Sequence, residues 1–151
     1  SLHQVTDTLG YDGGAFFSHD GSRIVFRATD FGSDDEIADY KESLALHQVR
    51  PGKMELYVID ADGQNRQQVT RLGEANFAPY FHPSDEKILF SSNHTWSGTG
   101  PINFDLYMIG VDGEDLERVT FDEDFDCFPM FSHEYFSSSY RFDRLLVFKR
   151  A

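Results

Sequence analysis

The chain has 151 residues, of which 40% are hydrophobic and 15% aromatic, a composition typical of a globular domain. No apolar run reaches the roughly 18 residues that a membrane-spanning helix needs, so the sequence excludes membrane insertion. The 13 basic and 26 acidic residues give a net charge of −13, which argues against nucleic acid and favours cations or basic protein surfaces as partners.

The first elements in chain order are short strands. Residues 2–6 have the character of a closing strand, and four runs rich in Phe, Tyr, Val and Ile follow, separated by Asp-Gly or Ser/Asp-rich turns, which is the pattern of hairpins. The four predicted strands of this unit, lettered a to d, are Ala15–Ser18, Arg23–Ala28, Glu55–Asp60 and Gln67–Thr70. Strands b and c are apolar at consecutive positions, so we expect both their faces to be covered.

Residues 30–53 interrupt this first unit between its strands b and c. Ser33 is followed three residues later by Glu36, which is the pattern of a capping box at the start of a helix. The apolar positions with helical spacing are Ile37, Tyr40 and Leu44. The segment therefore predicts a helix of about three turns that ends before Pro51 and Gly52.

A second unit repeats the first one 50 positions later. The segments Met54–Thr70 and Phe104–Thr120 share seven of seventeen residues. The predicted strands of the second unit are Pro79–His82, Lys87–Ser91, Asp105–Ile109 and Glu117–Thr120. A second insertion, 93–103, again separates strands b and c; it contains Trp96 among Gly and Pro residues and predicts a loop.

A third unit begins at Asp126–Ser132 and continues with Leu146–Phe148. Four-stranded units covered on both faces and repeated about every 50 residues predict an all-β fold made of β-propeller blades with four antiparallel strands each. A β-sandwich is the alternative, but a sandwich does not require a sequence repeat. We therefore predict one domain, 1–151, forming a partial propeller of about three blades, with the helical insertion at 30–53 inside the first full blade.

Three blades are fewer than a closed propeller contains, since propellers have four to eight. Residues 2–6 of one copy could complete the unfinished last blade of another copy. This arrangement would give a homodimer with six blades and would protect the exposed sheet edges.

The pattern of Phe17–Phe26, Phe-Ser-His-Asp-Gly-Ser-Arg-Ile-Val-Phe, is followed by Leu-Tyr-Val-Ile-Asp-Ala-Asp-Gly at 56–63 and by Gln68–Thr70. This arrangement resembles the TolB-like propeller repeat, and the resemblance recurs up to about Ser132. His19 stands where that family usually has Pro, and 133–143 replaces a short turn with an aromatic, Ser-rich segment. The resemblance implies a periplasmic protein that acts as an interaction scaffold of the cell envelope.

Acidic residues gather on one predicted face. Successive antiparallel strands alternate in direction, so the b-to-c and d-to-a connections lie on the same face of the blades, and both insertions belong to it. We predict that this face binds a protein or peptide, preferably a basic one, because a cluster of carboxylates focuses the field of the protein. The predicted binding residues are Asp12, Glu74, Asn76, Trp96, Asp122, Asp124 and Asp126. The alternative is that these acidic residues are ordinary solvent-exposed turn residues without a binding role.

Motifs of catalysis and metal binding are mostly missing from the sequence. It contains no Gly-x-Ser-x-Gly elbow, no His-Glu-x-x-His pair and no phosphate-binding loop. The candidate metal ligands are Asp12, Asp126 and His82, whereas His19 and His133 are placed in a-to-b turns on the opposite face. No loop has the spacing of a dedicated calcium site, so we predict no cofactor and keep calcium as an alternative.

A non-enzymatic binding scaffold is therefore the function that the sequence favours, although an enzymatic role stays open. One alternative is the gating propeller of a hydrolase or peptidase, which would require a hydrolase domain in addition to these blades. The other is a metal-dependent propeller lyase. An acidic channel mouth would repel acidic sugar substrates, which disfavours the lyase.

Overall fold

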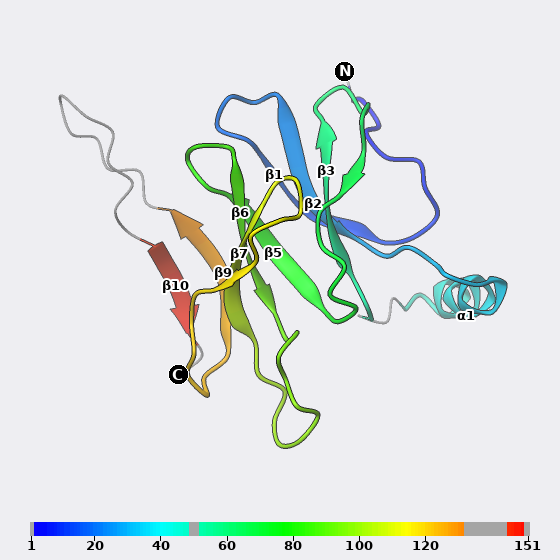
Figure 1. The fold of residues 1–151 in the computed structure, drawn as a ribbon. Coiled ribbons are helices and arrows are strands. Elements are labelled where there is room, and N and C mark those ends of the chain that lie inside the picture. Colours follow the sequence, from blue (N-terminus) through cyan, green and yellow to red (C-terminus); the bar gives the residue numbers. More distant parts are fainter. Residues whose placement is uncertain (1, 49–51, 132–144, 150–151) are drawn as a thin grey trace.

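The computed structural model of the chain describes residues 2–48, 52–131 and 145–149. Its strands form two four-stranded sheets and one two-stranded sheet, which lie side by side (Figure 1). All strand pairs within these sheets are antiparallel. The prediction of an all-β fold built from successive blades is confirmed. The segment 133–143, including His133, lies outside the described residues.

Blade 1 is a simple meander of four strands. Its strands are β1 (Asp12–Phe17), β2 (Arg23–Ala28), β3 (Glu55–Asp60) and β4 (Gln67–Gln68), in that order across the sheet. Strands β2 and β3 have the predicted bounds, because their long apolar runs leave little choice of register. Strand β4 is shorter than predicted: the hydroxyl oxygen of Thr70 accepts the hydrogen bond of the Leu56 amide, Oγ1 to N 2.8 Å, in place of a backbone carbonyl.

Blade 2 repeats this arrangement and blade 3 begins it. Blade 2 consists of β5 (Asn76–Phe81), β6 (Lys87–Ser92), β7 (Asp105–Gly110) and β8 (Glu117–Arg118). Blade 3 has β9 (Asp126–Phe131) paired with β10 (Leu145–Lys149). The inner strands β1 and β5 start earlier than predicted, at Asp12 and Asn76 and not at Ala15 and Pro79, and β9 begins at the equivalent residue, Asp126.

The predicted helix is present as α1 (Asp34–Ala45). The Ser33 hydroxyl accepts the hydrogen bond of the Glu36 amide at 3.3 Å, while the Glu36 carboxylate accepts that of the Gly32 amide at 2.6 Å. Helix α1 stands to the side of blade 1 and makes no close backbone contact with any described strand (Figure 1). Within the described residues, no helix combines the length and apolar character needed to cross a membrane.

One hydrophobic core joins blades 1 and 2. Val25, Leu56 and Val69 of blade 1 form a single buried cluster with Phe81 and Phe90 of blade 2. Each of these five side chains is at most 2% exposed. Because neither blade buries these residues alone, the two sheets should behave as one rigid unit that carries both insertions.

Two turn glycines show how one blade packs on the next. A Cβ on Gly113, in the turn between β7 and β8, would stand 2.8 Å from the carbonyl oxygen of Val69 in blade 1. A Cβ on Gly63, in the equivalent turn of blade 1, would stand 3.1 Å from the carbonyl oxygen of Val5. Residues 2–6 form no strand, so that prediction was wrong, yet Val5 lies against blade 1 as Val69 lies against blade 2.

Each inner strand contains a left-handed residue at the same position, next to a break in the strand register. In blade 1 this residue is Gly14, with φ +63°. We expect Gly14→Ala to lower the free energy of unfolding by about 1 kcal/mol, because alanine is strained in this region. Space is not limiting, since the nearest atom to an added Cβ is the Nε of Arg27 at 3.9 Å. Urea unfolding measures the change.

Gly32→Ala is the control for this prediction. A Cβ on Gly32 would meet the Glu36 carboxylate at an ordinary 3.5 Å, and Gly32 lies outside the left-handed region. Its substitution should change the free energy of unfolding by less than about 0.5 kcal/mol. Equal losses for Gly14→Ala and Gly32→Ala would show that backbone strain at Gly14 is not the cause of the lower free energy of unfolding.

Candidate functional site

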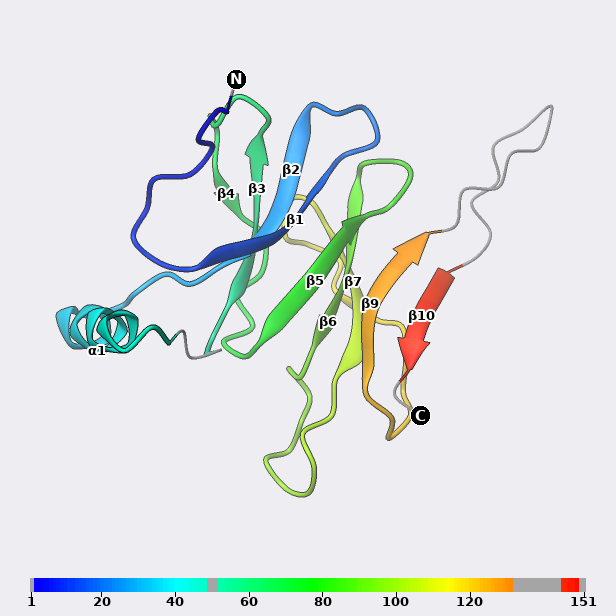
Figure 2. The same cartoon turned by 180° about the vertical axis from the view of Figure 1, so that it is seen from behind.

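The two insertions leave the propeller on the same side, as the alternation of strand direction predicts. Helix α1 follows β2, the loop 93–104 follows β6, and both extend from the same ends of their sheets (Figures 1 and 2). The side-chain amide of Asn103 donates a hydrogen bond from Nδ2 to the carbonyl oxygen of Asp122 at 3.0 Å, which ties the second insertion to the next d-to-a connection. We call the side formed by 30–48, 52–53, 71–75, 93–104 and 121–125 the insertion face.

The predicted binding residues divide by exposure. Glu74, Asp122 and Asp124 are exposed on the d-to-a connections, whereas Asp12 and Trp96 are half-buried. Asn76 and Asp126 are both 0% exposed. The structure therefore leaves Glu74, Asp122 and Asp124 accessible to a partner from solvent, and gives Asn76 and Asp126 a place between blades.

The junction between blades 1 and 2 is centred on the carboxylate of Glu55. It accepts hydrogen bonds from the Thr70 hydroxyl at 2.5 Å, from the Gly73 amide at 2.7 Å and from the Asn76 side-chain amide at 3.2 Å. The same amide of Asn76 donates to the carbonyl oxygens of Met54 at 2.9 Å and Glu74 at 3.1 Å. Asn76 thus fixes the start of blade 2 and the connection 71–75 to blade 1.

The junction between blades 2 and 3 has the same backbone arrangement and different side chains. The amide of Asp126 donates to the carbonyl oxygen of Phe104 at 2.9 Å, as the amide of Asn76 does to Met54 at 3.2 Å. Asp105 replaces Glu55 and forms an ion pair with Arg118 at 2.8 Å. Burial raises the pKa of Asp105, the Arg118 guanidinium opposes that rise, and the charges of Asp126 and Asp122 add to it.

A surface hollow of about 650 Å³ lies where the second insertion meets the connection 121–125. Its lining residues are Thr99, Pro101, Ile102, Asn103, Glu123, Asp124 and Phe125. Ile102 is 56% exposed, and Glu123 and Asp124 are exposed as well. The hollow therefore offers apolar and acidic groups together. Trp96 belongs to the same insertion but lies outside this lining.

An aromatic cluster that the sequence did not reveal supports the hollow. Phe104 lies 4.9 Å from Phe125 and 5.1 Å from Phe77 between ring centroids, and Phe77 lies 5.8 Å from Phe128. These four residues come from four segments, namely β5, the second insertion, the connection 121–125 and β9, so no local spacing links them. The only sequence signal is that Phe104 and Phe125 flank the insertion and the acidic connection.

The candidate metal ligands do not meet. Asp12 and Asp126 begin β1 and β9, whereas His82 follows the last residue of β5. A six-residue strand is about 20 Å long, so His82 lies at the other end of the inner strands. Within the described residues, no three His, Cys, Asp or Glu side chains form a group that could hold a metal ion.

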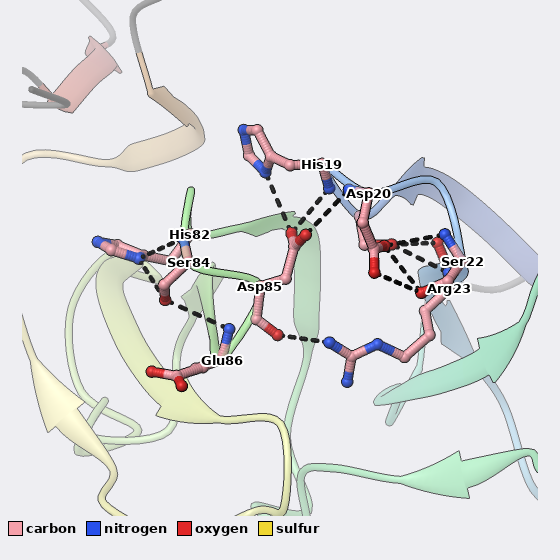
Figure 3. A network of polar contacts seen from close by, with 9 residues as sticks. His19, Asp20, Ser22, Arg23, His82, Ser84, Asp85 and Glu86 are labelled. Atoms are coloured by element: carbon pink, nitrogen blue, oxygen red, sulfur yellow. Dashed lines mark hydrogen bonds and ion pairs between the residues drawn. The ribbon is translucent and has the colours of Figure 1, made fainter. Parts of the chain in front are cut away.

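The sequence also separated His82 from His19, and this prediction was wrong. Both lie in a-to-b turns, after the last residues of β1 and β5 and therefore opposite the insertion face, and Figure 3 shows them on neighbouring turns beside Asp85. The His82 ring contacts the Ser84 hydroxyl, Nδ1 to Oγ 2.9 Å, and packs edge-on against Phe131 at 5.1 Å between centroids. Burial is the main cause that lowers the pKa of His82, followed by the charge of Lys87.

A polar network on this opposite side holds blades 1 and 2 together (Figure 3). The Asp85 carboxylate of blade 2 accepts hydrogen bonds from the backbone amides of His19 at 2.7 Å and Asp20 at 3.0 Å. The Arg23 guanidinium donates to the carbonyl oxygen of Asp85 at 2.6 Å. These groups satisfy one another across the blade junction, which assigns the side opposite the insertions a structural role.

Comparison with protein-family models gave no match, and comparison with curated proteins gave none either. Solved structures do match. A structure described as TolB of Agrobacterium tumefaciens is 21% identical, with a TM-score of 0.52, over 76% of this chain and 35% of that chain. TolB from Acinetobacter baumannii is 18% identical, with a TM-score of 0.61, over 96% of this chain and 33% of that chain.

This chain therefore spans about a third of the length of those structures. At these identities the likeness concerns the fold alone. It agrees with the two complete blades, the start of a third and the shared core between them. The chain has a TolB-like fold, a partial β-propeller with one inserted helix.

Proposed function

We propose that this chain is a non-enzymatic binding scaffold that takes a protein or peptide partner on its insertion face. The hollow between the second insertion and the connection 121–125 is the observation that supports this function most directly. Ile102 and Phe125 supply apolar surface, and Glu123 and Asp124 supply negative charge. A basic segment that also carries an apolar side chain matches both properties, since buried apolar anchors contribute affinity and charge contributes orientation and association rate.

The place of this scaffold in the cell is the cell envelope, in the periplasm. The TolB-like fold supports this part of the proposal. A homodimer that completes a six-bladed ring stays a prediction. The gating propeller of a hydrolase or peptidase and the propeller lyase have no observation among the described residues in their favour.

Selection from a random peptide library on the immobilised chain tests the proposal. We expect the selected peptides to combine Lys or Arg with aromatic or aliphatic residues. Ile102→Ser should weaken the binding of these peptides by about tenfold, because it removes an exposed apolar anchor. Glu123→Gln should weaken it by about fivefold at low salt and by less at high salt, because an exposed charge is screened.

Glu117→Gln is the matched control for the charge change. Glu117 is exposed at the start of β8 and does not line the hollow. This variant has the same net charge as Glu123→Gln and should bind the peptides within about twofold of the unmodified chain. Peptides that bind equally well to Ile102→Ser, Glu123→Gln and Glu117→Gln would place the binding surface elsewhere and overturn the proposal.

A further inference from the structure

A second cavity lies at the first insertion, between helix α1 and the segments 29–31 and 52–53 that connect it to β2 and β3. Its volume is about 280 Å³. Its lining residues are Thr29, Asp30, Phe31, Glu36, Asp39, Tyr40, Ser43, Gly52 and Lys53. Three carboxylates and two aromatic rings therefore surround a space that holds one side chain and not a whole peptide.

The carboxylates of this cavity differ in what already binds them. Both oxygens of Asp30 have partners, the Tyr57 hydroxyl and the Arg66 guanidinium. One oxygen of Glu36 accepts the hydrogen bond of the Gly32 amide. Asp39 is exposed and has no hydrogen bond or ion pair with any described residue. Asp39 and the second oxygen of Glu36 are the acceptors that a ligand could use.

The Ser43 side chain is an independent sign that this cavity suits a polar ligand. Ser43 is only 8% exposed and lines the cavity. Its hydroxyl has no hydrogen-bond partner among the residues that the structure describes. The hydroxyl oxygen is not fully enclosed by protein atoms, so a ligand group in the cavity can reach it and form a hydrogen bond.

The chain itself shows which cation fits a ring next to a carboxylate. The Arg66 guanidinium lies 3.9 Å above the centre of the Tyr57 ring and 3.2 Å from Asp30. The main cause that raises the pKa of Tyr57 is burial, followed by its hydrogen bond to Asp30, so the hydroxyl remains a donor.

The same combination of an arginine, a ring and a carboxylate recurs at the edge of blade 2. Arg118 lies 4.9 Å from the centre of the Phe121 ring and forms an ion pair with Asp105 at 2.8 Å. In both places the planar guanidinium stacks on a ring while its N–H groups reach a carboxylate. The cavity beside α1 has the rings, Phe31 and Tyr40, with centroids 4.9 Å apart, and the carboxylates, and among the described residues no arginine lines it.

We propose that this cavity binds the guanidinium group of an arginine side chain from a partner, with Asp39 and Glu36 as acceptors, Tyr40 and Phe31 as the stacking surface and Ser43 as a further hydrogen-bond partner. This inference rests on the proposed function and adds the chemistry of one partner residue at the first insertion. A metal ion fits less well, because the two rings supply no ligand. Lys53 contributes a competing positive charge.

Titration with N-acetyl-arginine amide, followed by NMR, tests the proposal on the full chain. We expect a Kd on the order of 1 mM, as for a ligand of this size, with shifts confined to the backbone signals of 29–43, Gly52 and Lys53. The lysine analogue should bind more weakly, because an ammonium group cannot stack and bridge two carboxylates at once. The uncharged citrulline analogue should not bind measurably.

Three substitutions of residues that line the cavity should change the affinity for N-acetyl-arginine amide in stated directions. Asp39→Asn should weaken the binding of N-acetyl-arginine amide by about fivefold, and Tyr40→Leu by about threefold. Lys53→Gln should strengthen it by about twofold, because it removes the competing charge. The control is Glu42→Gln on the same helix, an exposed acid that does not line the cavity, which should leave the affinity within about 1.5-fold.

Several results would overturn the proposal. They are the absence of shifts in 29–43, equal binding of citrulline and arginine, or equal losses for Asp39→Asn and Glu42→Gln, which would indicate only a diffuse negative field. Different results would contradict the proposed function and this inference. Peptides that depend on Ile102 and Glu123 but not on Asp39 would sink this inference alone. Arginine binding at Asp39 without any peptide dependence on Ile102 would sink the proposed function alone.

Discussion

Asn76→Asp is expected to lower the free energy of unfolding by about 3 kcal/mol at pH 7, because it places a buried carboxylate where a donor is needed. The Asn76 side chain is 0% exposed and donates to the carbonyl oxygens of Met54 and Glu74 and to the Glu55 carboxylate. An aspartate there loses these donors and adds a negative charge 3.2 Å from that of Glu55. Urea unfolding at pH 7 measures the loss.

The loss should shrink in acid. Burial and the charge of Glu55 will raise the pKa of the introduced aspartate in the folded state above the value of about 3.9 in the unfolded chain. A raised carboxyl pKa means that the folded state holds its proton more tightly, so the destabilisation is complete above the folded pKa and fades as the pH falls through it. Unfolding at pH 5 should therefore show a smaller difference from the unmodified chain than unfolding at pH 7.

Asn65→Asp is the matched control. The Asn65 amide also donates to a carboxylate, that of Asp60 at 2.6 Å, but Asn65 is exposed. The same chemical change should cost only about 0.5 to 1 kcal/mol there, because water and salt screen the new charge. Losses of equal size at positions 65 and 76, or a loss at position 76 that does not depend on pH, would show that Asn76 is not the buried tie between blades 1 and 2.

The comparison between Asn76 and Asp126 shows what the sequence could and could not predict. The repeat correctly aligned these two residues at the starts of equivalent strands, because local apolar runs set the position of each strand along the chain. Their burial was not predictable in the same way. Both are enclosed by contacts with the preceding blade, through Met54 and Phe104, and such contacts depend on how sheets pack and not on the pattern within one strand.

The same difference between local patterns and contacts across the fold applies to the insertion face. Helix α1 and its capping residue Ser33 were predictable, because helix initiation depends on neighbouring residues. The shared face of both insertions followed from the alternation of antiparallel strands. The hollow at Ile102 and the cavity at Ser43 were not predictable, because each is enclosed by several segments whose arrangement in space does not follow from a local sequence pattern.

Phe81→Ala should lower the free energy of unfolding by about 3 to 5 kcal/mol, the usual loss for a large aromatic side chain removed from a core. Phe81 ends β5, is 1% exposed and belongs to the cluster that joins blades 1 and 2. We expect both blades to lose stability together. NMR signals of Val25 in blade 1 and Ile88 in blade 2 should therefore disappear at the same, lower urea concentration.

Phe17→Ala is the sharpest comparison for this prediction, because Phe17 ends β1 as Phe81 ends β5. Phe17 is 63% exposed, so its removal should change the free energy of unfolding by less than about 1 kcal/mol. Phenylalanine at the same repeat position thus contributes differently to the free energy of unfolding, depending on whether a preceding blade covers it. Similar losses at both positions, or separate transitions for Val25 and Ile88, would mean that the blades fold independently and that the two insertions are not held on one rigid support.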